Sequence, residues 1–200
     1  MATGESFAAV VLAAGRASRF GGGKLLAPYE GRPLLHHALA AAKAAPVDEI
    51  LVVTGADADA VTACVRDFDP SVRTVHAADY AEGMAASLRA GLSAVSSTAT
   101  GAFVFLGDMP RVPHAVLEPL AMAIREGAAA AAPTFAGRRG NPVVLSHELF
   151  AEVATLAGDV GARPILERLG ARLHAVASPD DGVLFDVDVP ADLSGQTLRS

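Results

Sequence analysis

Three cationic side chains lie in a glycine-rich segment that directly follows a dense apolar run. The run ends at Gly15, and the next residues include Arg16, Arg19 and Lys24, with three consecutive glycines at 21–23. Glycine permits tight turns and lets the backbone approach a ligand closely. Exposed N–H groups in such a loop bind anions, and arginine and lysine add positive charge. The segment therefore predicts a binding site for a polyphosphate.

The spacing of this segment differs from two common phosphate-binding motifs. Lys24 is followed by Leu25, whereas a P-loop lysine is followed by a Ser or Thr that contacts Mg²⁺. Gly15 is followed by Arg16 and Ala17, so the dinucleotide motif G-x-G-x-x-G is absent at this position. Spacing alone leaves a second interpretation open, in which the segment is only a glycine-rich connection between a strand and a helix.

Acidic residues in two distant segments suggest a metal site. Asp108 follows the apolar run 101–106, and Asp186 and Asp188 lie in the sequence Phe-Asp-Val-Asp-Val-Pro. Mg²⁺ prefers carboxylate oxygens, usually one or two, together with phosphate oxygens and water. One aspartate from each segment would hold Mg²⁺ against the triphosphate. The alternatives are that Asp108 caps the helix that begins near Pro113 and that the later acids are structural.

Strand-length apolar runs alternate with helical patterns along the chain. The expected strands cover residues 7–13, 49–54, 72–76, 101–106 and 128–133. The expected helices cover residues 33–45, 57–67, 83–95, 113–126, 146–156 and 161–169. Continuous rather than alternating hydrophobicity indicates strands buried on both faces. The pattern predicts an α/β fold with a mostly parallel sheet, and residues 134–145 are expected to form an inserted turn and hairpin.

Ligands of such sheets bind beyond the carboxyl ends of the strands. These ends are expected at Gly15, Gly55, Ala77 and Gly107. The first and last of them adjoin the cationic segment and Asp108. If residues 185–189 are extended, Asp186 and Asp188 share one face of that segment.

Composition narrows the class of protein. The 200 residues predict one domain, with a core at 7–192 and a polar tail at 193–200 that frays. A net charge of −6 without a basic stripe argues against nucleic acid as a partner. No apolar run reaches the roughly 18 residues of a membrane span, and the N-terminus lacks the pattern of a secretory signal. Cys64 is the single cysteine. We therefore expect a cytoplasmic protein without a disulfide or a structural zinc site.

Taken together, six ordered segments resemble a known family. They include V-L-A-A-G followed by R-F-G-x-x-K, then L-G-D-M-P-x-V, G-x-R-G-N-P-V and D-V-D-V-P-x-D, and the segments 83–91 and 158–163. This set is similar to the MobA-like nucleotidyltransferases, and within them to the molybdenum cofactor cytidylyltransferases. The resemblance implies a three-layer, Rossmann-like fold. It also implies Mg²⁺-dependent transfer of a nucleotide from CTP, or from GTP in the neighbouring branch, to molybdopterin or its molybdenum adduct, with release of pyrophosphate. A molybdoenzyme client is a possible partner.

The resemblance also implies roles for individual residues. Arg19, Lys24 and Asp108 would be catalytic, and Asp108 and Asp188 would bind Mg²⁺, with Asp186 as a weaker candidate. The nucleotide would be contacted by Leu12, Ala13, Ala14, Gly15, Arg19, Lys24, Gly83 and Ser87. Ser87, Arg89 and the 83–88 loop would help to select the base or ribose. The acceptor would be contacted by Asn141, Gly158, Asp159 and Arg163. Independently of the resemblance, Arg138 and Arg139 form a small basic pair in the expected hairpin, which is either solvated or steers an anionic acceptor toward the site.

Some positions depart from the family pattern and keep other functions open. Ala17 replaces a serine of the cationic segment, with Ser18 one position later, and Ala85 removes a hydroxyl near the expected base or acceptor pocket. One alternative is an NAD(P)H-dependent oxidoreductase of the same family, similar to nicotine blue oxidoreductase. Another is a chaperone that binds finished molybdenum cofactor without catalysis. Nothing in the residues themselves separates cytosine from guanine.

Overall fold

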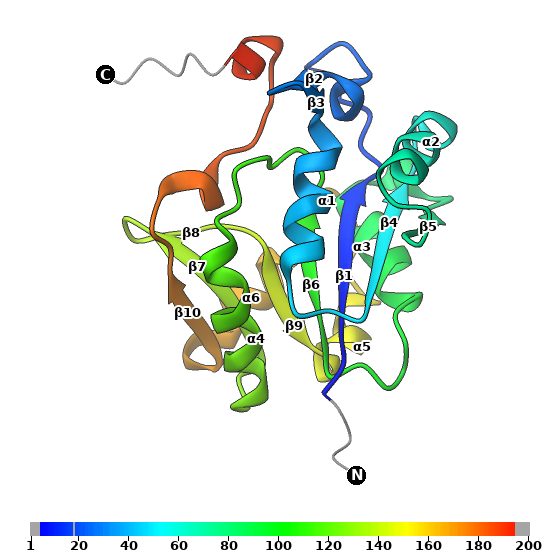
Figure 1. Cartoon of the computed structure of the whole chain (residues 1–200). Helices are drawn as coiled ribbons and strands as arrows, with labels where there is room; N and C mark the ends of the chain where they lie inside the picture. The colour runs from blue at the N-terminus through cyan, green and yellow to red at the C-terminus, as the bar shows by residue number, and fades with distance from the viewer. Residues whose placement is uncertain (1–4, 18, 195–200) are drawn as a thin grey trace.

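A mostly parallel sheet runs through the middle of the molecule (Figure 1). The structure is a computed structural model that describes residues 5–17 and 19–194. In this part of the chain the main sheet has eight strands in the order β10-β7-β9-β6-β1-β4-β5, with β8 paired to β7. The strands are β1 (Phe7–Ala13), β4 (Glu49–Thr54), β5 (Arg73–His76), β6 (Gly101–Leu106), β7 (Ala130–Phe135), β8 (Arg138–Arg139), β9 (Val143–Ser146) and β10 (Leu173–Ala177). A separate two-stranded ribbon joins β2 (Pro28–Tyr29) to β3 (Arg32–Pro33).

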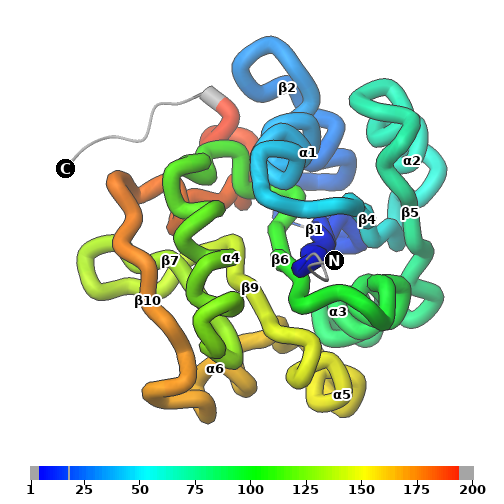
Figure 2. Tube along the Cα trace, turned by 60° about the horizontal axis from the view of Figure 1, so that its bottom comes forward, coloured from blue at the N-terminus to red at the C-terminus, as the bar shows by residue number. Residues whose placement is uncertain are grey.

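Helices cover both faces of this sheet, which gives three layers (Figure 2). One face packs against α1 (Leu34–Ala44), α2 (Ala58–Phe68) and α4 (Leu117–Arg125). The other packs against α3 (Met84–Ser93), α5 (Phe150–Val153) and α6 (Arg163–Leu169). Successive residues of β1 alternate between the two cores: Ala9 and Val11 lie in the first, and Ala8 and Val10 in the second. This alternation explains the continuous apolar run, because a strand covered on both faces needs apolar residues at every position.

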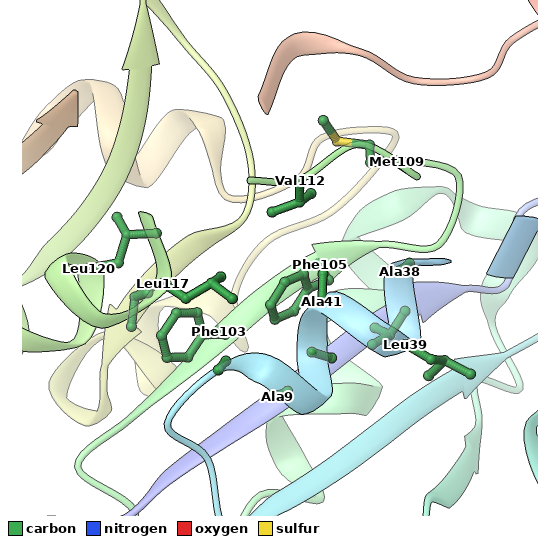
Figure 3. Packing of buried hydrophobic residues seen from close by; sticks show 14 of the residues in the cluster. Ala9, Ala38, Leu39, Ala41, Phe103, Phe105, Met109, Val112, Leu117 and Leu120 are labelled. Carbon is green, nitrogen blue, oxygen red and sulfur yellow. The ribbon is translucent and has the colours of Figure 1, made fainter. Parts of the chain in front are cut away.

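The core beneath α1 and α4 is shown in Figure 3. The rings of Phe103 and Phe105 stack with their centroids 5.9 Å apart, and Leu39 of α1 and Leu117 of α4 belong to the same buried cluster. Each such buried side chain contributes about 1.5–3 kcal/mol relative to an exposed one. Packing of Phe103 and Phe105 in this core therefore holds β6, the strand that leads to Asp108, in place.

The predicted α/β fold with a mostly parallel central sheet is confirmed, with differences at its edge. Strand β9 is a full member of the sheet and runs antiparallel to both β6 and β7, rather than only forming a hairpin arm. Strand β10 was not predicted. Val176 is its only buried residue, so its sequence shows neither the apolar run of a buried strand nor a regular apolar–polar alternation. The helices expected at 113–126 and 146–156 each begin with a 3-10 turn, at His114–Val116 and His147–Leu149.

The remaining 3-10 turns are Lys24–Leu26, Tyr80–Glu82, Gly170–Arg172, Asp181–Leu184 and Pro190–Ser194. Residues 193 and 194 belong to the last of these turns, and the fraying expected of the tail 193–200 stays a prediction. Residues 195–200 lie outside the described part. Among the described residues, none of the helices is both long enough and apolar enough to span a membrane.

The carboxyl ends of the parallel strands lie level at one edge of the sheet. Ala13 of β1 pairs with Thr54 of β4, and Leu12 pairs with Leu106 of β6. The segment after β1 and the last part of the chain lie at this same end (Figure 1). The edge therefore gathers the residues that the sequence singled out.

Candidate functional site

Four charged side chains from distant segments meet at this edge. The Lys24 Nζ lies 2.6 Å from Asp108 Oδ2 and 4.0 Å from Asp188 Oδ1. The Arg19 Nη1 lies 3.3 Å from the other oxygen of Asp188. The side chains of Lys24 and Asp108 are 12% and 23% exposed, whereas those of Arg19 and Asp188 are 78% and 51% exposed. The site thus has a half-buried ion pair at its base and an exposed one at its mouth.

The cations are positioned by the turn that precedes Lys24. The backbone N–H groups of Phe20, Gly21 and Gly22 all donate to the Ala17 carbonyl. The three glycines at 21–23 have φ values of 90°, 96° and 63°, which side-chain-bearing residues rarely adopt. Lys24 then begins the 3-10 turn Lys24–Leu26. The three glycines are therefore needed to reverse the chain so that Arg19 and Lys24 face the same carboxylate.

The two aspartates are positioned by contacts between their own segments. The N–H of Val187 donates to the Asp108 carbonyl at 3.0 Å, and the Val187 side chain is buried. Beyond it, the Asp192 carboxylate accepts the N–H groups of Asp188 and Val189 at 2.8 and 2.9 Å. Asp192 thus fixes the turn on which Asp188 lies.

The segment that carries Asp188 is anchored through Arg111. The guanidinium of Arg111 lies 4.0 Å from the ring centroid of Phe185 and donates to the Tyr29 hydroxyl at 2.6 Å. The N–H of Asn141 donates to the Val183 carbonyl at 2.9 Å. These contacts hold the end of the chain across the carboxyl edge of the sheet.

Asp186 has a different environment from Asp188. Residues 185–189 form no strand, so the condition under which Asp186 and Asp188 were expected to share one face is not met. Partial burial, and then the negative charges of Asp108 and Asp188, raise the pKa of Asp186 above its ordinary value. Asp186 therefore lies near the same carboxylates but has no ion pair with Lys24 or Arg19 in the described residues.

A cavity of about 480 Å³ opens beside the cationic segment. Eight of the residues expected to bind nucleotide or metal line it: Leu12, Ala13, Ala14, Gly15, Lys24, Gly83, Ser87 and Asp108. Arg19 is not among the lining residues and instead reaches Asp188. Ser18 lies outside the described residues, so the hydroxyl that could replace the missing serine at position 17 is not placed.

A second cavity of about 610 Å³ adjoins the first. Leu12, Met84, Leu106 and Asp159 line both of them. Asn141, Asp159 and Arg163, expected at the acceptor, line the second cavity, as do Arg138 and Arg139. Gly158 is not a lining residue; its carbonyl accepts the N–H of Ala85 at 3.2 Å.

The boundary between the two cavities is built from a helix end and a loop. Asp159 accepts the N–H of Met84, the first residue of α3, at 3.2 Å. Gly83 precedes it with φ 117°, and a Cβ on Gly83 would lie 2.6 Å from the Gly158 carbonyl oxygen. Only glycine therefore allows α3 and the 158–161 loop to meet closely at this boundary.

Other residues differ from their expected roles. Arg89 lines neither cavity; it donates to the Leu156 carbonyl and pairs with Glu82, and so ties α3 to the 158–161 side. Tyr80 was not predicted, yet it lines the first cavity, as does Met84 of the expected 83–88 loop. The Arg16 guanidinium lies 5.7 Å from the Tyr80 ring centroid. Tyr80 follows Ala77, which the sequence had marked as a strand end, so its position could have been found.

The donor set at the edge suits a divalent cation that also contacts a ligand. Asp108 and Asp188 both approach one positive group, the Lys24 ammonium. Among residues 5–17 and 19–194, no group of three or more His, Cys, Asp or Glu side chains could hold a metal ion. Two carboxylates with further oxygens from phosphate fit Mg²⁺ or a similar hard cation. The arrangement can therefore bind a polyphosphate and neutralise its charge.

Comparisons with known proteins show the family to which the chain belongs. The family model for the MobA-like NTP transferase domain matches residues 9–175. Nicotine blue oxidoreductase of Paenarthrobacter nicotinovorans is 33% identical over 187 residues, which cover 90% of each chain.

Solved structures give a similar result. Rv0371c from Mycobacterium tuberculosis H37Rv is 32% identical, covers 98% of both chains and superposes with a TM-score of 0.84. It has also been solved in complex with manganese. A nucleotidyl transferase from Methanothermobacter thermautotroptrophicus is 27% identical over 96% of both chains, with a TM-score of 0.79. The chain therefore belongs to the MobA-like NTP transferase family of nucleotidyltransferases.

Proposed function

We propose that this protein is a Mg²⁺-dependent nucleotidyltransferase. It transfers the nucleotidyl group of CTP to a phosphorylated acceptor, molybdopterin or its molybdenum adduct, and releases pyrophosphate. The single observation that carries the proposal is the convergence of Lys24 with both Asp108 and Asp188 beside the first cavity. Rv0371c, which is similar over 98% of both chains, has been solved in complex with manganese, and this supports a divalent cation as a ligand. On this proposal, residues 7–192 act as one catalytic domain.

In the proposed reaction, an acceptor phosphate oxygen attacks the α-phosphorus, and the bond from that phosphorus to the bridging oxygen of pyrophosphate breaks. Both reactants are anions, so positioning and charge neutralisation provide most of the catalysis. Lys24 and Arg19 contact the triphosphate, and Asp108 and Asp188 would hold Mg²⁺. When bound, Mg²⁺ supplies positive charge against the developing pyrophosphate. A phosphate acceptor is already ionised at neutral pH, so no general base is required.

The second cavity supports an anionic acceptor with an apolar body. Arg138, Arg139 and Arg163 contribute positive charge to its wall. The apolar side chains of Leu88, Val104 and Leu166 also line it. A pterin ring with a phosphate group matches this combination. The choice of CTP over GTP rests on the resemblance in sequence, and a molybdoenzyme that accepts the product would be the client.

One alternative has a specific observation in its favour. Nicotine blue oxidoreductase is similar along 90% of both chains, so an NAD(P)H-dependent reduction is the second candidate. The four-charge cluster at the edge favours nucleotidyl transfer, because hydride transfer does not require paired carboxylates beside two cations. A chaperone without catalysis is disfavoured for the same reason.

A panel of nucleoside triphosphates, each with and without molybdopterin, tests the proposal. Pyrophosphate release is measured with Mg²⁺ present, and nicotinamide absorbance is followed in parallel with candidate pigments. We expect release from CTP, or from GTP, only when molybdopterin is added. Oxidation of NAD(P)H without any pyrophosphate release would replace the proposal with the oxidoreductase.

A further inference from the structure

Lys24 occupies the position between the two carboxylates that would hold Mg²⁺. Its ammonium contacts Asp108 at 2.6 Å and approaches Asp188 at 4.0 Å. Arg19 pairs with the remaining side of Asp188. The two cations and two carboxylates balance one another, and the Lys24 side chain is only 12% exposed. The carboxylate pair is therefore already neutralised by the chain itself.

We propose that Lys24 is a tethered cation that competes with the divalent metal for Asp108 and Asp188, so that the metal binds tightly only together with the nucleotide. This inference rests on the proposed function. It goes further in assigning Lys24 a second task, that of making metal binding depend on the triphosphate.

The competition follows from charge and distance. Lys24 contacts Oδ2 of Asp108, so a divalent cation that binds this oxygen must displace the ammonium. With Arg19 and Lys24 still nearby, the added charge is also repelled at short range, where a partly desolvated site screens poorly. Without nucleotide, the metal therefore binds the two carboxylates more weakly than it would bind a carboxylate pair that had no ammonium between its members.

A bound nucleotide relieves this competition, because Lys24 lies between Asp108 and the cavity. The same side chain that pairs with Asp108 also lines the 480 Å³ cavity. Its flexible four-carbon stem lets the ammonium move from carboxylate to phosphate. A triphosphate in the cavity offers Lys24 and Arg19 new anionic partners and leaves the carboxylates to the metal. By thermodynamic linkage, metal and nucleotide then raise each other's affinity by the same factor.

The test measures Mn²⁺ binding directly, by titration with detection of free Mn²⁺ by electron paramagnetic resonance. It compares the wild-type protein, Lys24→Met and Lys43→Met, each alone and with the α,β-methylene analogue of CTP or of GTP. Protein-free blanks correct for Mn²⁺ held by the analogue. Lys43 is a control, because it also pairs with an aspartate, Asp69, but neither residue lines either cavity. Circular dichroism checks folding, and Lys24→Gln serves if Lys24→Met does not fold.

We expect wild type and Lys43→Met to bind Mn²⁺ weakly alone and at least tenfold more tightly with an analogue. We expect Lys24→Met to bind Mn²⁺ alone at least tenfold more tightly than wild type, and to gain less from the analogue. Adding Asp108→Asn to Lys24→Met should abolish the increase.

Two results overturn the inference and are distinguishable. If wild type gains Mn²⁺ affinity with an analogue but Lys24→Met and Lys24→Gln bind Mn²⁺ alone no better than wild type, the proposed function stands and the competition is wrong. If wild type binds no Mn²⁺ with either analogue, the metal-dependent function itself fails, and the inference fails with it.

Discussion

Asp108 illustrates how far a single residue can be interpreted from its surroundings in the chain. Its place directly after a buried strand predicted that it would face the ligand edge, and it lines the first cavity there. The alternative role as a helix cap is wrong, since the 3-10 turn before α4 begins at His114, with Pro113 at the cap position. Lys24 was also predicted from the sequence. Its distance from Asp108 could not be predicted, because this distance depends on the positive φ angles of the glycine turn at 21–23.

Replacing Asp108 with Ala should lower the rate of pyrophosphate release by at least about a hundredfold, by analogy with the loss of other groups that stabilise charge in a transition state. The fold should persist, because the side chain is partly exposed and its neighbours keep their backbone hydrogen bonds. Steady-state kinetics with circular dichroism checks this. Asp180→Asn, which removes an exposed carboxylate that lines neither cavity, is the control. An Asp108→Ala protein as active as the control would exclude a catalytic role.

Replacing Arg163 with Met should raise the KM for the acceptor about tenfold, because a charge-assisted contact to an anion is worth about 1.5–3 kcal/mol at most and is reduced near solvent. The KM for the nucleotide should change little, since Arg163 lines only the second cavity. Initial-rate kinetics with each substrate varied in turn separates the two effects. A larger effect on the nucleotide than on the acceptor would show that the cavities have been assigned to the wrong substrates.

At the scale of elements, the central strands were predictable and the edges were not. Strands such as β1 and β6 are apolar at nearly every position because helices cover both faces, so the apolar run in the sequence predicts their bounds. β10 is mostly exposed, and the segment with Asp186 and Asp188 is irregular, so neither has a periodic pattern. The position of Asp188 depends on Arg111, Phe185 and Asp192, which are contacts that no local pattern indicates.

Gly83→Ala should destabilise the boundary between the cavities. An added Cβ meets the Gly158 carbonyl oxygen at 2.6 Å, and the positive φ adds strain of about 1–3 kcal/mol. Gly127→Ala is the matched control, because it has φ 95° but no atom within 4 Å of an added Cβ. Chemical denaturation should show a larger loss for Gly83→Ala, and nucleotide binding should weaken only in that variant. If both variants lost the same free energy of unfolding and nucleotide binding did not change, the 158–161 loop would have moved to accommodate the added methyl group.

At the scale of the whole molecule, the ribbon of β2 and β3 joins the last segment of the chain to α1. The Tyr29 hydroxyl accepts a hydrogen bond from Arg111, while the Tyr29 ring meets His37 of α1 edge-on at 5.1 Å. His37 Nε2 lies 2.8 Å from the Tyr29 carbonyl, and His37 Nδ1 lies 3.2 Å from an Arg32 nitrogen. A neutral ring fits the two shorter contacts, with Nε2 donating to the carbonyl and Nδ1 accepting from Arg32, whose Nε lies 3.3 Å from Nε2.

Burial lowers the pKa of His37 below its ordinary 6.5, and the positive charge of Arg32 adds to the effect. The folded protein therefore binds fewer protons at this residue than the unfolded chain does. The stability that His37 contributes is complete above pH 6.5 and is lost as the pH falls below it, by up to about 1.4 kcal/mol per pH unit. Urea denaturation at pH 7.5 and 5.5 should show a smaller pH dependence for His37→Gln than for wild type. Parallel pH dependences for the two proteins would contradict a neutral buried ring.

Above all, we propose that Asp108 and Asp188, from distant parts of the chain, bind one divalent cation beside the cationic segment. A double-mutant cycle tests it most directly: pyrophosphate release is measured for wild type, Asp108→Asn, Asp188→Asn and the double variant under identical conditions. If both carboxylates serve one ion, the double variant should lose little more activity than the worse single variant, because groups that act as a unit are non-additive. If the two losses multiply in the double variant, the carboxylates act independently and the shared site is wrong.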